Sequence, residues 1–146
     1  MSKPFVVLMA EDNEHDIVAT KRSWVKNKIR NPLYVVNDGE ECLDYLYRRG
    51  KYADKKDAPR PGLLLLDINM PRLDGISVLK TIRADENLKL LPVVILTTSQ
   101  NEAEKIESYS LGVNAYVKKP MGFDGFNDAI SKIHFFWELV ELPEVE

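Results

Sequence analysis

The chain has 146 residues, 45% of them hydrophobic, which fits one domain with its own core and excludes a globally disordered chain. Its net charge of −3, with both signs interspersed, argues against direct nucleic-acid binding as the main role. A single cysteine, Cys42, permits no internal disulfide. We therefore expect a cytoplasmic protein with no membrane-spanning segment and no membrane partner.

Apolar patterns typical of strands and of helices alternate along the chain. Strands are predicted at residues 5–10, 33–36, 63–66, 92–97 and 115–117, and helices at 14–29, 40–49, 75–84, 102–111 and from 123 onward. Five repeats of strand followed by helix predict an α/β fold, doubly wound around a five-stranded parallel sheet flanked by five helices. The polar, basic segment 48–61 indicates a surface loop.

Two helices carry predictions about which side chains face the core. The first helix should bury a stripe of five residues: Ile17, Val18, Trp24, Val25 and Ile29. The fourth helix offers only a weak stripe, formed by Ala103, Ile106 and Ser110. A helix with so little apolar surface is poorly anchored, so we expect it to be able to move.

The most informative stretch is residues 62–75, where an unbroken apolar run ends abruptly at Asp67. Apolar residues without alternation are typical of a central strand that is covered on both faces. Met70 and Pro71 cannot continue that strand. Asp67 should therefore lie at the carboxyl end of a central strand, which is where open α/β sheets place their ligands.

Other predicted strands also end in polar side chains. Glu11 and Asp12 follow the first strand, Thr97 ends the fourth, and Lys119 follows the fifth. Any one carboxylate in such a position could simply cap the next helix. If the strands are parallel, however, all of these side chains meet Asp67 at one edge of the sheet, and so many coincident caps are hard to explain.

The chemistry of this group points to phosphoryl transfer. An aspartate such as Asp67 can act as a nucleophile toward phosphorus, and oxygen ligands suit a divalent cation such as Mg²⁺. The predicted metal ligands are the side chains of Glu11, Asp12 and Asp67 and the backbone carbonyl of Asn69. Lys119 and Thr97 would contact the phosphoryl oxygens.

A magnesium-dependent phosphohydrolase is the alternative function. Phosphatases of the haloacid dehalogenase type place a second aspartate, a general acid, two residues after the nucleophile. Here that position is Asn69, whose amide does not titrate. The chain also lacks an insertion that could cover a small substrate, so a phosphoacceptor that is not an enzyme is favoured.

In combination, these motifs resemble the receiver domain of two-component response regulators, over essentially residues 4–135. The resemblance rests on the acidic pair, on Asp67 followed by Met-Pro-x-x-Asp-Gly, on Thr97, and on Lys119-Pro120 after Gly112 and Tyr116. It implies a flavodoxin-like fold with strand order 2-1-3-4-5 and a sensor histidine kinase as partner. It also implies Asp67 as phosphoacceptor, Thr97 and Tyr116 as a switch pair, Lys119 as the phosphate-binding lysine, and a cis Lys119-Pro120 bond.

Three stretches resemble the small single-domain regulators that work with cyanobacterial phytochromes and bacteriophytochromes. They are residues 60–63, the loop 50–59, and the tail at 136–139 and 142–143. This resemblance implies a phytochrome-type kinase. We expect residues 1–146 to form one receiver domain with a short C-terminal helix extension from about residue 135. Since the chain ends soon after that helix, output is expected through a partner or a change of oligomeric state.

The last helix contains a second apolar group beside its core-facing seam. This group consists of Phe135, Phe136, Leu139 and Leu142. If it stays exposed in a monomer, it forms the kind of patch that marks a protein interface. We therefore predict a symmetric homodimer through the last helix, the neighbouring strand and the fourth helix, tightened by phosphorylation. The alternative is that the tail folds back onto its own domain.

Overall fold

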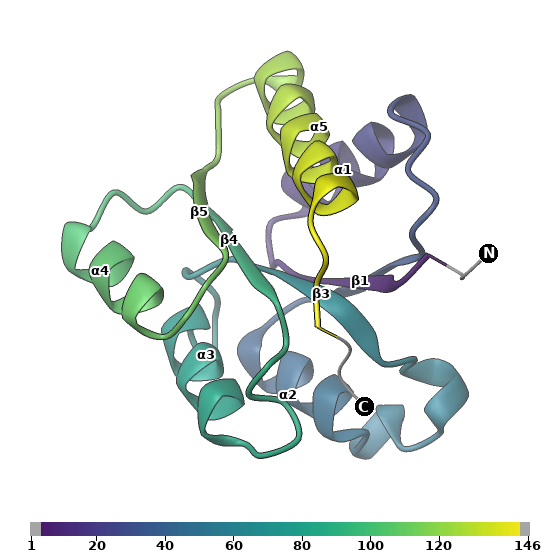
Figure 1. The fold of residues 1–146 in the computed structure, drawn as a ribbon, viewed down its shortest axis with the longest axis vertical. Coiled ribbons are helices and arrows are strands. Elements are labelled where there is room, and N and C mark those ends of the chain that lie inside the picture. Colours follow the sequence, from purple (N-terminus) through teal and green to yellow (C-terminus); the bar gives the residue numbers. More distant parts are fainter. Residues whose placement is uncertain (1–3, 144–146) are drawn as a thin grey trace.

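In this computed structural model, the described part of the chain, residues 4–143, forms a five-stranded parallel sheet with helices on both faces (Figure 1). The strands are β1 (Val6–Ala10), β2 (Leu33–Val36), β3 (Pro61–Leu66), β4 (Val93–Thr97) and β5 (Ala115–Lys118). The helices are α1 (Glu14–Lys26), α2 (Gly39–Tyr47), α3 (Gly75–Ala84), α4 (Glu102–Ser110) and α5 (Phe123–Leu139). The strand order β2-β1-β3-β4-β5 confirms the predicted flavodoxin-like topology. None of these helices is long and apolar enough to cross a bilayer.

Strand β3 is buried on both faces, as its unbroken apolar run predicted. Leu63 and Leu65 belong to the core on one side of the sheet, under α1 and α5. Leu64 and Leu66 belong to the core on the other side, together with residues of α2 and α3. The apolar run is thus explained by the central position of β3, between β1 and β4.

Four of the helices begin at an Asn or Asp whose side chain accepts a backbone N–H of the first turn. These N-cap residues are Asn13, Asp38, Asp74 and Asn101. Such caps satisfy helix donors that have no partner within the helix. Asn13 and Asp38 lie only a few residues beyond the ends of β1 and β2, so these two caps add polar groups to the edge of the sheet.

The predicted buried face of α1 is partly wrong. Val18 and Val25 are exposed, whereas Thr20 and Ser23 are buried beside Trp24. Thr20 satisfies its hydroxyl by donating to the backbone carbonyl of its own helix four residues earlier, at 2.7 Å. The element that α1 approaches closely is α5. Small polar side chains can be buried at such a place, which a pattern of apolar residues alone does not reveal.

Helix α4 is held mainly at its C-terminal end. The predicted stripe of Ala103, Ile106 and Ser110 is exposed, and Ser108 is the only residue of this helix that is buried. Arg83 of α3 donates from its guanidinium to the carbonyls of Leu111 at 2.6 Å and Gly112 at 3.1 Å, just beyond α4. The same side chain also donates to carbonyls that precede β4. Arg83 therefore ties the end of α4 to α3, in line with the expectation of a weakly anchored helix.

The second apolar group of α5 is divided between core and surface. Phe135 and Leu139 are exposed, at 65% and 69%. Phe136 and Leu142 instead pack against the core between α5 and the sheet, so the expectation that all four stay exposed is wrong. The tail after α5 turns back along the domain, as the alternative interpretation held, but it covers only part of the group.

Gly75 lies where the backbone of α3 touches the loop after β3. Its N–H donates to the carbonyl of Ile68 at 2.8 Å. A Cβ atom at this position would lie 2.2 Å from the carbonyl oxygen of Asp67. Because that neighbour is backbone, the close approach can be relieved only by moving the loop that carries Asp67.

We therefore predict that Gly75→Ala destabilises the fold by about 1–3 kcal/mol, the usual cost of forcing extra volume into a closely packed site. Urea unfolding followed by circular dichroism measures this change. Ser77→Ala, in the same turn of α3, is the control and should have a much smaller effect. Wild-type stability for Gly75→Ala would show that the loop has room to move.

Candidate functional site

The polar residues predicted to converge do lie at one edge of the sheet. Three of them are fixed by a backbone hydrogen bond that continues the strand pairing by one residue. The N–H of Asp67 donates to the carbonyl of Ala10 at 3.1 Å, and the N–H of Lys119 donates to that of Thr97 at 2.8 Å. The N–H of Glu11 donates in the same way to the last residue of β2 at 2.9 Å. The sheet itself therefore sets the spacing of these side chains.

The ammonium group of Lys119 lies at the centre of the site. Its Nζ is 2.5 Å from Oε1 of Glu11, 2.8 Å from Oδ2 of Asp16 and 3.1 Å from Oδ2 of Asp67. The side chains of Glu11, Asp67 and Lys119 are all nearly inaccessible to solvent. Buried charges are tolerated when they are paired and hydrogen-bonded in this way.

Three of the carboxylates can approach one cation. Glu11, Asp12 and Asp67 each offer an oxygen atom, and these atoms lie within 4.8 Å of one another. They line a cavity of about 480 Å³ at the edge of the sheet, and Asn69 and Lys119 also line it. Asp12 is exposed toward this cavity, so a hydrated cation can reach the buried oxygens. An all-oxygen donor set with room for water fits Mg²⁺.

The charges in the site perturb one another. Burial raises the pKa of Glu11 to about 7, with a smaller contribution from the negative charge of Asp67, although the hydrogen bond from Lys119 opposes the rise. Burial alone lowers the pKa of Lys119, but its hydrogen bonds to Asp16 and Glu11, together with the Asp67 charge, raise it above its ordinary value. The lysine therefore stays charged, while Glu11 is balanced between binding a proton and binding a cation.

Thr97 and Tyr116, the predicted switch pair, are placed differently. Thr97 ends β4 at the same edge and is fully buried, and its hydroxyl accepts the N–H of Ser99 at 3.2 Å. Tyr116 lies opposite Ile95 in the sheet register, and its hydroxyl is 3.4 Å from the carbonyl of Ser99. Both side chains therefore contact the segment between β4 and α4.

Sequence reasoning missed Asp16, which contacts Lys119 as closely as the predicted partners do. It lies in the first turn of α1, and that helix begins directly after the acidic pair at the end of β1. An acid so close to the edge of the sheet was the available signal. The implied cis bond is also not found, because the Lys119-Pro120 bond is trans, as is every described peptide bond. Trans is the more stable isomer of such bonds by about 0.5–1 kcal/mol.

The parallel sheet and its acidic edge with one lysine define the class of the protein. Residues 7–131 match the response regulator receiver domain family. The chain belongs to this family.

Two members of the family are similar to this chain over nearly its whole length. Response regulator Rcp1 of Synechocystis is 38% identical over 141 residues, covering 96% of this chain and 94% of the relative. The crystal structure of the Mn²⁺-bound form of Rcp1 matches with a TM-score of 0.88 at 37% identity, covering 97% of this chain and 100% of the other. The phosphorylated cyanobacterial phytochrome response regulator RcpA also has a TM-score of 0.88, at 36% identity and with 97% and 99% covered.

Family membership has two consequences for the site. Receiver domains are signalling proteins rather than classical enzymes, which leaves the phosphohydrolase alternative without support. The acidic group of Glu11, Asp12 and Asp67 fits a divalent cation, normally Mg²⁺ in this family, and the Mn²⁺-bound form of Rcp1 agrees with that donor set.

The raised pKa of Glu11 predicts a pH-dependent metal affinity. Below about pH 7, Glu11 carries a proton that must leave before its oxygen can bind a cation. The apparent affinity for Mg²⁺ should therefore fall as the pH drops below this value, by at most about tenfold per pH unit for one displaced proton, and level off above it. Titration calorimetry over a range of pH measures this profile.

Glu11→Gln is the control, because its side chain has the same shape and no proton to lose. This variant should bind Mg²⁺ more weakly, and the pH dependence near neutrality should be lost. A wild-type affinity that stays flat through this range would contradict the role given to Glu11.

Proposed function

We propose that the chain accepts a phosphoryl group from a sensor histidine kinase on Asp67, in a reaction that depends on Mg²⁺. The supporting observation is that the buried carboxylate of Asp67 lies at one sheet edge beside Lys119 and within a group of three carboxylates that can share one cation. In this reaction, a carboxylate oxygen of Asp67 attacks phosphorus and the bond from phosphorus to the kinase histidine breaks. The imidazole of the kinase, which carries a proton on its other ring nitrogen, leaves as a neutral group, and an acyl phosphate is formed on Asp67.

The surrounding residues have distinct roles in this proposal. A cation held by Glu11, Asp12, Asp67 and the Asn69 carbonyl screens the negative charge that repels an incoming phosphoryl group. Lys119 donates hydrogen bonds to the phosphoryl oxygens.

Thr97 and Tyr116 transmit the change. The phosphoryl group adds about one to two negative charges and three acceptor oxygens, and the Thr97 hydroxyl turns toward them. This movement disturbs the contacts that both residues make with Ser99, at the start of the segment leading into α4. A helix that buries only Ser108 is easily shifted by such a change.

The kinase in this proposal is of the phytochrome type and acts in the cytoplasm. The proposal is supported by similarity to RcpA, a phytochrome response regulator. A hollow of about 360 Å³ lies between α1 and the start of α5, lined by His15, Val18 and Phe123, and shares Asp16 with the site. Val18 is exposed in this hollow and gives the kinase an apolar contact there.

We expect Asp67→Asn to abolish phosphorylation and leave the fold intact, because the change is nearly isosteric and removes only the nucleophile. Label transfer from an autophosphorylated phytochrome-type kinase, and mass gain with acetyl phosphate, measure the reaction. Asp128→Asn, an exposed carboxylate on α5, is the matched control. Wild-type labelling of Asp67→Asn would refute the phosphoacceptor assignment. A wild-type protein that is labelled by acetyl phosphate but not by the kinase would refute the kinase pairing.

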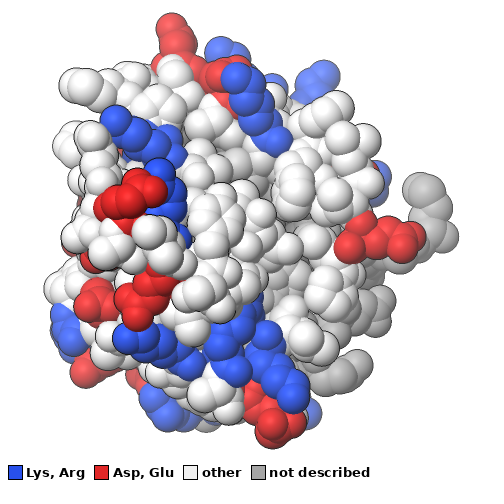
Figure 2. All heavy atoms as spheres, turned by 60° about the vertical axis from the view of Figure 1, so that its left-hand side comes forward, with Lys and Arg blue, Asp and Glu red and all other residues white. Residues whose placement is uncertain are grey.

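We also propose that a second copy of the chain covers the side formed by α4, β5 and α5. Figure 2 views the molecule from the side on which α4 lies in Figure 1, and the middle of this face carries few charged residues. The large apolar side chains exposed on α4, on α5 and at the C-cap of α5 are Ile106, Tyr109, Phe135, Leu139 and Val140. An uncharged face of this kind is typical of a protein interface.

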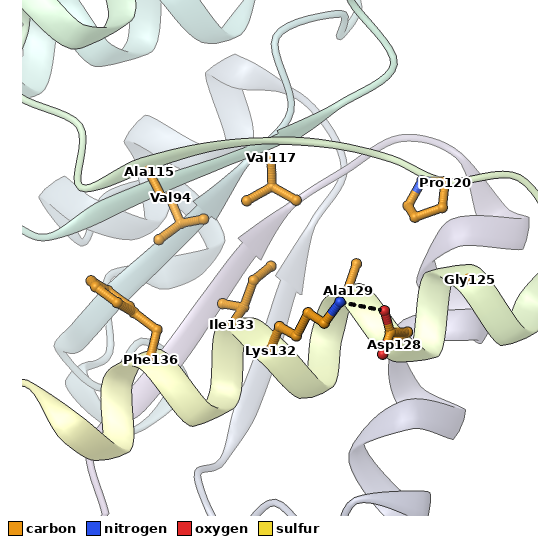
Figure 3. A pocket seen from close by; sticks show the side chains of 10 residues that line it. All are labelled: Val94, Ala115, Val117, Pro120, Gly125, Asp128, Ala129, Lys132, Ile133 and Phe136. Carbon is orange, nitrogen blue, oxygen red and sulfur yellow. Dashed lines mark ion pairs between the residues drawn. The ribbon is translucent and has the colours of Figure 1, made fainter.

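A groove of about 420 Å³ runs between β5 and α5 on this side (Figure 3). Val117 and Ile133 line it from opposite sides, and Phe136 closes one end. The ion pair of Lys132 with Asp128, at 2.9 Å, lies along its helix side. In the proposed interface, Phe136 therefore forms part of the groove, while Phe135 and Leu139 are exposed on the helix.

We therefore expect Phe135→Asp and Leu139→Asp to weaken self-association, because each places a charge in an apolar contact. Analytical ultracentrifugation at tens of micromolar measures this with and without Mg²⁺ and beryllofluoride, a phosphoryl mimic that should tighten the dimer. Val25→Asp, exposed on α1 away from this face, is the control. A wild type that remains monomeric under both conditions would exclude the dimer.

A further inference from the structure

The Lys119 ammonium is already enclosed by three carboxylates. Nζ donates to Oδ2 of Asp16 at 2.8 Å and to Oδ2 of Asp67 at 3.1 Å, and it forms an ion pair with Oε1 of Glu11 at 2.5 Å. A phosphoryl group on Asp67 would replace the single Asp67 oxygen by several strongly charged acceptor oxygens. Turning more of its N–H donors toward them draws the ammonium away from its other partners.

The three partners differ in how easily they can be released. Asp67 itself becomes part of the acyl phosphate, so its contact with Lys119 passes to the phosphoryl oxygens. The side chain of Glu11 is 1% exposed, so its release from Lys119 would leave a buried and poorly paired charge. The side chain of Asp16 is 24% exposed, and water can solvate its carboxylate once the lysine leaves. Asp16 also does not belong to the group of carboxylates that can share a cation.

We propose that Asp16 is a positioning residue that holds the Lys119 ammonium while Asp67 is unmodified and is released when a phosphoryl group arrives. This inference rests on the proposed function of Asp67 as the phosphoacceptor. The contact between Asp16 and Lys119 then competes with the phosphoryl group. Its loss is a cost of phosphorylation, and Asp16 lowers the affinity of the site for a phosphoryl group.

The backbone of Asp16 explains why its side chain cannot follow Lys119 into the site. Its N–H donates to Oδ1 of Asn13 at 3.1 Å, and its carbonyl accepts the hydroxyl of Thr20 at 2.7 Å. These bonds fix the first turn of α1 through main-chain atoms. Shortening the side chain therefore removes the contact with Lys119 without removing the bonds that hold the helix start.

Beryllofluoride binding to Mg²⁺-saturated protein tests this competition directly. Asp16→Ala should bind the mimic about three- to tenfold more tightly than wild type, the range for losing a competing charged contact that is partly exposed. Asp16→Asn should fall between the two, because its amide oxygen is a weaker, neutral acceptor. Fluorescence or calorimetric titration measures the affinities.

Two further measurements separate this role from a structural or general electrostatic one. Glu14→Ala removes an exposed acid from the same first turn of α1 and should leave the affinity close to that of wild type. In nuclear magnetic resonance spectra, the Lys119 ammonium signal of unliganded Asp16→Ala should be displaced from its wild-type position toward that of the mimic-bound protein.

The outcomes are distinct. An Asp16→Ala affinity equal to or below that of wild type, an equal gain in Glu14→Ala, or an unmoved Lys119 signal would overturn the role of Asp16 alone. A wild type that binds no beryllofluoride in the presence of Mg²⁺ would instead overturn the proposed function of Asp67.

Discussion

The ion pairs of Lys119 are the interaction on which the organisation of this protein depends. Parallel strand ends bring Glu11 and Asp67 to one edge, where both are buried. Carboxylates so close repel one another and lose hydration, and the raised pKa of Glu11 records that cost. The ammonium offsets it in the metal-free protein. The carboxylate of Asp67 is thereby paired with a cationic group inside a folded domain.

The sheet topology makes this arrangement possible with few constraints on the rest of the chain. Strand β3 lies between β1 and β4, so the residue that follows it is flanked by the ends of both neighbours. Backbone hydrogen bonds carry the pairing just past the strands, to Asp67 and Lys119. Side chains far apart in sequence thus meet at distances set by main-chain geometry, while loops and helix surfaces remain free to differ.

Sequence patterns predicted the sheet and most of the site because both follow from local signals. An uninterrupted apolar run identifies a central strand, and a polar residue at its end marks the edge. They failed where burial depends on contacts between elements. Thr20 is buried and Val18 is exposed on α1, whose close neighbour is α5, and Phe136 packs against the core between α5 and the sheet. Asp16 was missed because its partner lies 103 residues away.

The hydrogen bonds of the Arg83 guanidinium determine which end of α4 can move. They clamp the segment just beyond α4 at the base of the sheet, whereas the start of α4 follows the residues next to Thr97. Because α4 is held by Arg83 at its C-terminal end and buries only Ser108 along its length, its N-terminal end is the part that can move. A small displacement at the sheet edge would then rotate the exposed surface of α4 about its C-terminal end.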